Sequence, residues 1–321
     1  HPLGEALPAQ TAPHFYRTLF SIAIPVTIGA SMMPIVNLVD ASLVVNRLTH
    51  IGYELKNARE MYGVLTGMVN TMVNMPAVIT LSFSMSLVPA VSSALTKKDQ
   101  QGLQRMISTG LKLALMIGSA AAVGMGLLSH QILRLLYASQ PENCLELGGQ
   151  LLAIMSVGVL FLAVVQTTTG MLQGLGKPSY PVKTLLVGIV AKTVLNYVLI
   201  GIPQINVLGA AIATVVCYAI AALGNVYMVL KLSKTKLKPV DALVRPALAA
   251  GGMGAAVGGF VRLMGGRLGN TMLTLGAVCL GVLVYAVLAF VLRALSKEDL
   301  ALIPGGRRVA RLMDKLGGKK A

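Results

Sequence analysis

Two ionisable side chains, Asp40 and Lys192, lie far inside long apolar stretches of the sequence. Asn37 stands three residues before Asp40, and Asn196 stands four residues after Lys192, so each pair would share one face of a helix. Charged groups within apolar helices are costly, and they mark ion or substrate paths or buried ion pairs. The spacing therefore predicts either a polar cavity lined by both charges or an ion pair that joins two helices.

Uncharged polar residues recur at helical spacing in two other apolar stretches. Asn70 and Asn74 are four residues apart, and Gln166 and Gln173 are seven residues apart, so each pair would again share a helix face. Such side chains either line a cavity or hydrogen-bond a neighbouring helix, a contact worth about 1 kcal/mol. Both alternatives are open for these four residues.

The composition places these residues in a membrane protein. Of 321 residues, 55% are hydrophobic and 12% are charged, and the mean hydropathy is +0.75. An average soluble domain has about 25% charged residues, so an ordinary soluble globule is excluded. Disorder requires low hydrophobicity and high charge, so it is excluded too. The sequence predicts an all-α polytopic membrane protein.

Eight stretches have the roughly 20 apolar residues that a transmembrane helix needs. The second and fourth stretches are long enough to bend or to project beyond the bilayer. A shorter apolar piece over 130–138 is expected to be an interfacial helix. The predicted spans are residues 18–45, 62–95, 104–128, 145–175, 179–201, 207–230, 242–264 and 270–293.

The positive charges predict the orientation of these spans. Lys and Arg number 27 against 11 Asp and Glu, which gives a formal charge of +16. With eight spans, both ends of the chain lie on the same side of the membrane. The ends and loops on that side hold 19 of the 27 positive residues, and the loops on the opposite side hold 6. Because positive loops stay in the cytoplasm, both ends are expected to be cytoplasmic. The charge excess then meets anionic membrane lipids, and nucleic acid is not an expected partner.

The two ends of the chain differ from its middle. Residues 1–14 are a polar lead-in that starts without Met, which suggests a linker from an N-terminal part not included here. Residues 296–321 are a basic tail, which either lies along the anionic inner leaflet or is simply solvated. In the seventh span, Gly254 and Gly258 permit close helix packing or, alternatively, a lipid-binding groove.

The sequence shows no pattern that predicts enzymatic chemistry. The three Cys and four His residues are scattered, so neither a metal site nor a cofactor is expected. No phosphate-binding loop, nucleophile elbow or HExxH motif occurs. We therefore do not expect an enzyme.

From about residue 15 onward, the sequence resembles polysaccharide-biosynthesis and stage V sporulation protein B-type transporters. These belong, with the MurJ-like lipid II flippases, to the multidrug/oligosaccharidyl-lipid/polysaccharide exporter superfamily. The most specific match is the Gln-Gly-Leu-Gly-Lys-Pro run at 173–178 with the Thr run before it. The other matching stretches are 24–26, 37–40, 62–68, 74–76, 86–90, 192–197 and 209–214.

This resemblance implies two six-helix lobes and two additional helices that work by alternating access. On that map residues 15–232 are the second lobe, residues 233–295 are the additional helices, and the first lobe is a missing partner. The implied cargo is a polyprenyl-pyrophosphate-linked oligosaccharide such as lipid II. Coupling to sodium, protons or the membrane potential is left open.

Two other functions are compatible with the residues. A drug or cation antiporter of the same fold would need cavity carboxylates, and only Asp40 among the 11 acidic residues lies within a span. A non-transporting scaffold for envelope assembly would lack buried polar faces, contrary to the polar residues named above.

Overall fold

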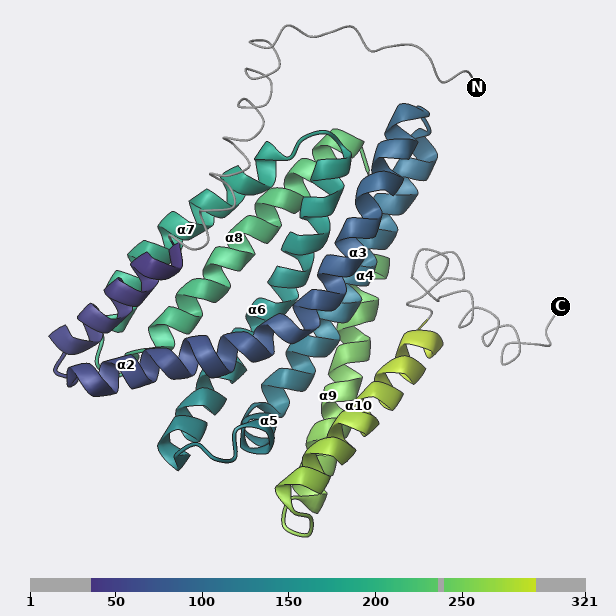
Figure 1. The fold of residues 1–321 in the computed structure, drawn as a ribbon. Coiled ribbons are helices and arrows are strands. Elements are labelled where there is room, and N and C mark those ends of the chain that lie inside the picture. The colour runs from purple at the N-terminus through teal and green to yellow at the C-terminus, as the bar shows by residue number, and fades with distance from the viewer. Residues whose placement is uncertain (1–35, 236–239, 293–321) are drawn as a thin grey trace, which may run out of the picture. The chain divides into compact units, whose positions relative to one another are not determined.

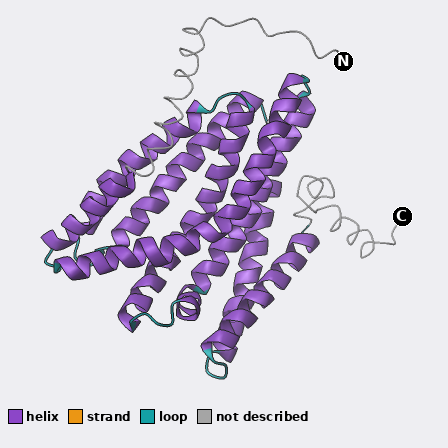
Figure 2. Ribbon diagram, in the orientation of Figure 1, coloured by secondary structure: helices purple, strands orange, loops and turns teal. Residues whose placement is uncertain are grey.

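The computed structural model describes residues 36–235 and 240–292. The chain divides into two units, His1–Leu43 and Val44–Ala321, which are described separately. All regular structure in the described ranges is helical, without strands (Figure 2). This confirms the predicted all-α class.

Seven described segments are long and apolar enough to cross a membrane, and they match seven of the eight predicted spans within a few residues at most ends. The predicted first span, 18–45, falls mostly outside the described residues, although residues 36–50 are helical. The helices after it are α2 (Leu55–Gly63), the π-helix η1 (Val64–Val69), α3 (Asn70–Thr96), α4 (Gln100–Leu127), α5 (Ser129–Leu136), α6 (Glu142–Gly174), α7 (Ser179–Ile200), α8 (Leu208–Ser233), the π-helix η2 (Val240–Val244), α9 (Arg245–Met264) and α10 (Asn270–Val291).

The second predicted span is part of one long, bent helix. The segments α2, η1 and α3 run without a break over 42 residues, Leu55–Thr96, and they change direction along the way (Figure 1). A straight helix of that length would measure about 63 Å, roughly twice the hydrocarbon thickness. The π-turn and the internal Pro76 and Pro89 interrupt the regular backbone hydrogen bonds and allow the bend. Of the two alternatives predicted for this span, the structure therefore shows the bend.

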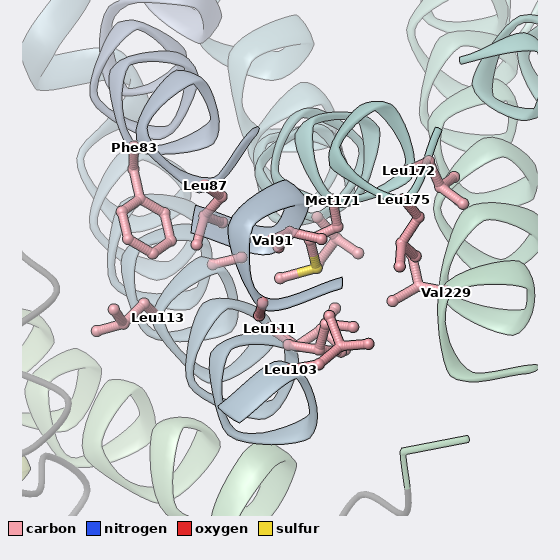
Figure 3. Close-up of a cluster of buried hydrophobic side chains, with 14 of the residues drawn as sticks. Phe83, Leu87, Val91, Leu103, Leu111, Leu113, Met171, Leu172, Leu175 and Val229 are labelled. Carbon is pink, nitrogen blue, oxygen red and sulfur yellow. The ribbon is translucent and has the colours of Figure 1, made fainter. Parts of the chain in front are cut away.

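Helix α6 is the centre of the second unit. It packs against α3, α4, α5 and α8. Between α3, α4, α6 and α8 lies a buried apolar cluster to which Leu87, Leu111, Met171 and Val229 belong (Figure 3). Because α6 is buried on several sides, it fixes the relative positions of the helices around it.

The last two spans pack onto the bundle through α4 and α5. The Tyr285 hydroxyl on α10 donates to the Met116 carbonyl on α4 at 2.7 Å. A Cβ added to Gly254 would lie 2.8 Å from Val123 of α4, whereas one added to Gly258 would meet nothing within 4 Å. The Gly-rich face of α9 therefore packs at Gly254 and is open at Gly258. The open part is a groove of about 550 Å³ lined by Leu127, Gly254, Ala255, Gly258, Gly259, Val261 and Arg262.

The short apolar piece predicted over 130–138 forms α5. Leu133 is fully buried and lies over Gly148 of α6. Two polar side-chain contacts join α5 to the start of α6: His130 Nδ1 lies 3.4 Å from Glu146 Oε2, and Arg134 forms an ion pair with Glu142. The helix is thus confirmed, and its place at the membrane surface stays a prediction.

Candidate functional site

Helix α7 carries the most prominent pair of candidate residues. Asn196 is completely buried, and Lys192, one turn earlier, is half-buried. The neighbouring side chains Val194 and Val198 are more than half exposed. Helix α7 therefore has an apolar outer face and a polar inner face, as the four-residue spacing predicted.

Arg47 holds the end of α7. Its Nε donates to the Tyr197 carbonyl at 3.1 Å, and its guanidinium lies 4.3 Å from the centre of the Tyr197 ring. Such stacking of Arg on an aromatic face is stabilising, and it uses the planar guanidinium. The contact fixes the helical turn that carries Asn196. This contact was not predictable from the sequence, because the two residues are 150 positions apart.

A second polar contact joins α7 to α8. The Thr184 hydroxyl donates to Asn225 Oδ1 at 2.6 Å, and Asn225 is completely buried. Within the described residues, Asn225 Nδ2 has no hydrogen-bond partner. Nearby, a Cβ on Gly188 would lie 2.8 Å from the Cys217 carbonyl, so only glycine permits this helix approach. These contacts between separate helices were not predictable from helical spacing either.

Thr184→Val is expected to lower the free energy of unfolding by about 1–2 kcal/mol, because it leaves the buried Asn225 oxygen without its donor. The matched control is Thr193→Val on the same helix, whose hydroxyl donates only to the Ile189 carbonyl of its own helix. Thermal unfolding in detergent would measure both variants. Equal midpoints would contradict the prediction.

Gln166 lies in the contact between α6 and α3. Its side-chain oxygen accepts a hydrogen bond from Thr80, and its carbonyl accepts one from the Ser84 hydroxyl at 2.6 Å. Of the two alternatives for Gln166, the structure therefore shows the contact between helices. A further role in a cavity stays a prediction. In the sequence, this contact between α3 and α6 is indicated by Gly170 and Gly174. They are four residues apart, and they face Ser84 and Val88.

The other predicted residues are spread over the two units. On α3, Asn70 is half-buried and Asn74 is exposed, and Gln173 is exposed near the end of α6. In the first unit, Asn37 is exposed, and Asp40 is 7% exposed. The predicted relation between Asp40 and Lys192 stays a prediction. No group of three His, Cys, Asp or Glu residues that could hold a metal occurs in the described part.

Residues 65–198 match the family model MatE. This segment consists mostly of α3, α4, α6 and α7. Beyond this match, the chain is 26% identical to the lipid II flippase MurJ of Bacillus subtilis over 301 residues, which are 91% of the chain and 55% of the flippase. It is 24% identical to the stage V sporulation protein B of the same organism over 90% of the chain and 54% of that protein.

A solved structure shares the fold of most of the chain. It is a lipid II flippase MurJ in an inward closed conformation, 17% identical, with a TM-score of 0.67 over 88% of this chain and 55% of that one. The chain thus spans about half the length of the relatives it matches. These findings confirm the resemblance and establish a multipass membrane protein. The predicted limits of the lobe, the additional helices and the tail stay predictions, as does the orientation of the termini.

Proposed function

We propose that the chain acts in a flippase that moves a polyprenyl-pyrophosphate-linked sugar across the cytoplasmic membrane by alternating access. The observation that carries the proposal is the half-buried Lys192 in the segment that matches the MatE model, in a chain whose relatives include a lipid II flippase. In this proposal residues 15–232 rock against a second six-helix lobe of the same protein, as in other transporters built from repeats.

The side chains suit such a cargo. An ammonium group is attracted to a phosphate more strongly in a partly buried site than in water, because the effective dielectric constant is lower. Lys192 would bind the pyrophosphate, and the buried Asn196 amide would orient it one turn away. Asp40 would either hold Lys192 between transport steps or take part in ion coupling. Asn37, Asn70, Asn74, Gln166 and Gln173 would line the path of the sugar.

The groove on α9 suits the other end of the cargo. Its lining of Gly, Ala, Leu and Val residues is apolar, with Arg262 as the one charged member among its lining residues. A polyprenyl chain would gain the stabilisation of burying apolar surface while the sugar crosses. In this proposal the two additional helices bind the lipid tail of the cargo.

A cation or multidrug antiporter of the same fold is the second candidate. The observation that favours it is the burial of the Asp40 carboxylate, since ionisable groups within membranes commonly couple transport to ions. Such an antiporter would export drug cations and would not transport lipid-linked sugars.

Rescue of a bacterial strain depleted of its lipid II flippase, by the full-length product of this gene, tests the first candidate. We expect restored growth and restored movement of the labelled lipid precursor to the outer leaflet. A protein that reaches the membrane, fails to rescue growth and exports drug cations would overturn the flippase and favour the antiporter.

A further inference from the structure

Arg47 stabilises the C-terminal end of α7 from a neighbouring helix. It is half-buried in the helical residues 36–50, in the part of them that belongs to the same unit as α7. Tyr197, to whose carbonyl its Nε donates at 3.1 Å, is among the last four residues of α7. The carbonyls of the last turn have no partner within a helix, and a cation near them is favoured by the helix dipole. The Arg47 side chain therefore caps α7 from a part of the chain 150 positions away.

The guanidinium of Arg47 fits closely against the end of α7. The centre of the Tyr197 ring is 4.3 Å away from it. A Cβ on Gly201, which follows the last residue of α7, would lie 2.5 Å from Arg47 Nη2 and 3.0 Å from its Nε. Gly201 has φ −66° and ψ −10°, a conformation that alanine adopts without strain. Glycine is therefore needed here for the space that the guanidinium occupies, and not for the backbone.

The position of α7 depends on few contacts. It is the least buried of the seven candidate spans in the described ranges: 17% of its apolar stretch is buried, against 61% for α6. It packs mainly on α8, and the hydrogen bond between Thr184 and Asn225 ties its first half to that helix. Arg47 ties its other end. Lys192 lies between the two contacts, five residues before Tyr197, which is about 7.5 Å along the helix axis.

We propose that Arg47 is a positioning residue, which holds the second half of α7 and thereby sets where the Lys192 ammonium lies in the transport site. The inference rests on the proposed function and deepens it, because it adds a residue that acts through the cargo-binding side chain. A displacement of about 1 Å is enough to weaken a well-placed contact strongly. Arginine suits this role better than lysine, since a planar guanidinium can stack on the Tyr197 ring and donate to the carbonyl at the same time.

Cysteine labelling tests the positioning without any transport. Lys192→Cys and, as the matched control, Lys183→Cys on the same helix would be placed in the full-length protein with its other cysteines replaced by alanine. Both would be treated with N-ethylmaleimide in native membranes. We expect Gly201→Ala, whose new methyl group displaces the guanidinium, to change the labelling rate of Lys192→Cys at least about threefold, because thiol reactivity depends on access and surroundings. Arg47→Ala is expected to cause a similar change.

The control separates positioning from general stability. Lys183→Cys lies near the opposite end of α7, so its labelling rate is expected to stay the same in both variants. An unchanged rate at Lys192→Cys in either variant would overturn the proposal. A change of similar size at Lys183→Cys would overturn it too, because Arg47 would then stabilise α7 as a whole.

Flipping of a labelled lipid precursor by the full-length protein shows whether Arg47 acts through Lys192. With Lys192 present, Arg47→Ala is expected to lower the flipping rate at least about tenfold. In a Lys192→Ala background it is expected to cause no further loss. No loss in the first case, or an equal loss in both, would overturn the positioning role. Absence of flipping by the protein without substitutions would contradict the proposed function instead, and the labelling result would be unaffected.

Discussion

Lys192→Ala is expected to lower the rate of lipid flipping by about tenfold or more, with normal insertion into the membrane. Lys192 is half-buried on α7, one turn from the fully buried Asn196. Contacts to charged groups contribute about 1.5–3 kcal/mol, which corresponds to roughly 10- to 100-fold in rate if the contact is made during transport. Flipping of a labelled lipid precursor by the full-length protein in vesicles would measure the effect.

Lys183→Ala is the matched control for this experiment. It removes the same side chain from the same helix, but Lys183 is exposed near the start of α7, where its Nζ lies 5.7 Å from the Tyr180 ring. We expect less than about a twofold change, since exposed contacts of this kind contribute well under 1 kcal/mol. If Lys192→Ala flips lipid as fast as Lys183→Ala, Lys192 has no role in transport.

The same assay tests the predicted relation between Asp40 and Lys192. If the two side chains act in one step, the double alanine variant is expected to be about as active as the less active of the two single variants. Losses that multiply would show that the residues act independently. Normal transport in both single variants would show that transport needs neither a cavity lined by Asp40 and Lys192 nor an ion pair between them.

Gly170→Leu is expected to lower the free energy of unfolding by about 3 kcal/mol or more. Gly170 is buried on α6 and faces the side chain and the backbone of Ser84 on α3, so a Cβ there has no room. One turn later, a Cβ on Gly174 would lie 2.8 Å from the Val88 carbonyl. Overpacking a tight core commonly costs about 1–3 kcal/mol, and here backbone blocks the relaxation.

The stability measurement has a close control in Gly251→Leu. Gly251 is also within a transmembrane helix, but it is exposed, and a Cβ there would meet nothing within 4 Å. At roughly 2–4 °C per kcal/mol, Gly170→Leu should lower the midpoint of thermal unfolding by about 6 °C or more, and Gly251→Leu by little. Similar midpoints for both variants would mean that α3 and α6 do not depend on this close approach.

Hydropathy alone was sufficient to locate the seven predicted spans that lie within the described residues. The predicted spans 179–201 and 270–293 correspond to Ser179–Ile200 and Asn270–Val291. This success has a local cause: about 20 consecutive apolar residues suffice for a membrane helix, whatever its neighbours. The position of the π-turn at Val64–Val69 was not predictable in this way, because it is a change in backbone hydrogen bonding within a continuous helical pattern.

Sequence spacing also determined which polar residues share a helix face, as for Lys192 and Asn196, because helical periodicity is a property of the chain itself. Only the tertiary structure decided which faces meet. Thr184 and Asn225 are 41 positions apart, and Thr80 and Gln166 are 86 apart. These contacts depend on how close two helices approach, and that distance is set by small residues such as Gly170 and Gly188 packing against another backbone. Periodicity places a side chain on its own helix, whereas packing chooses its partner.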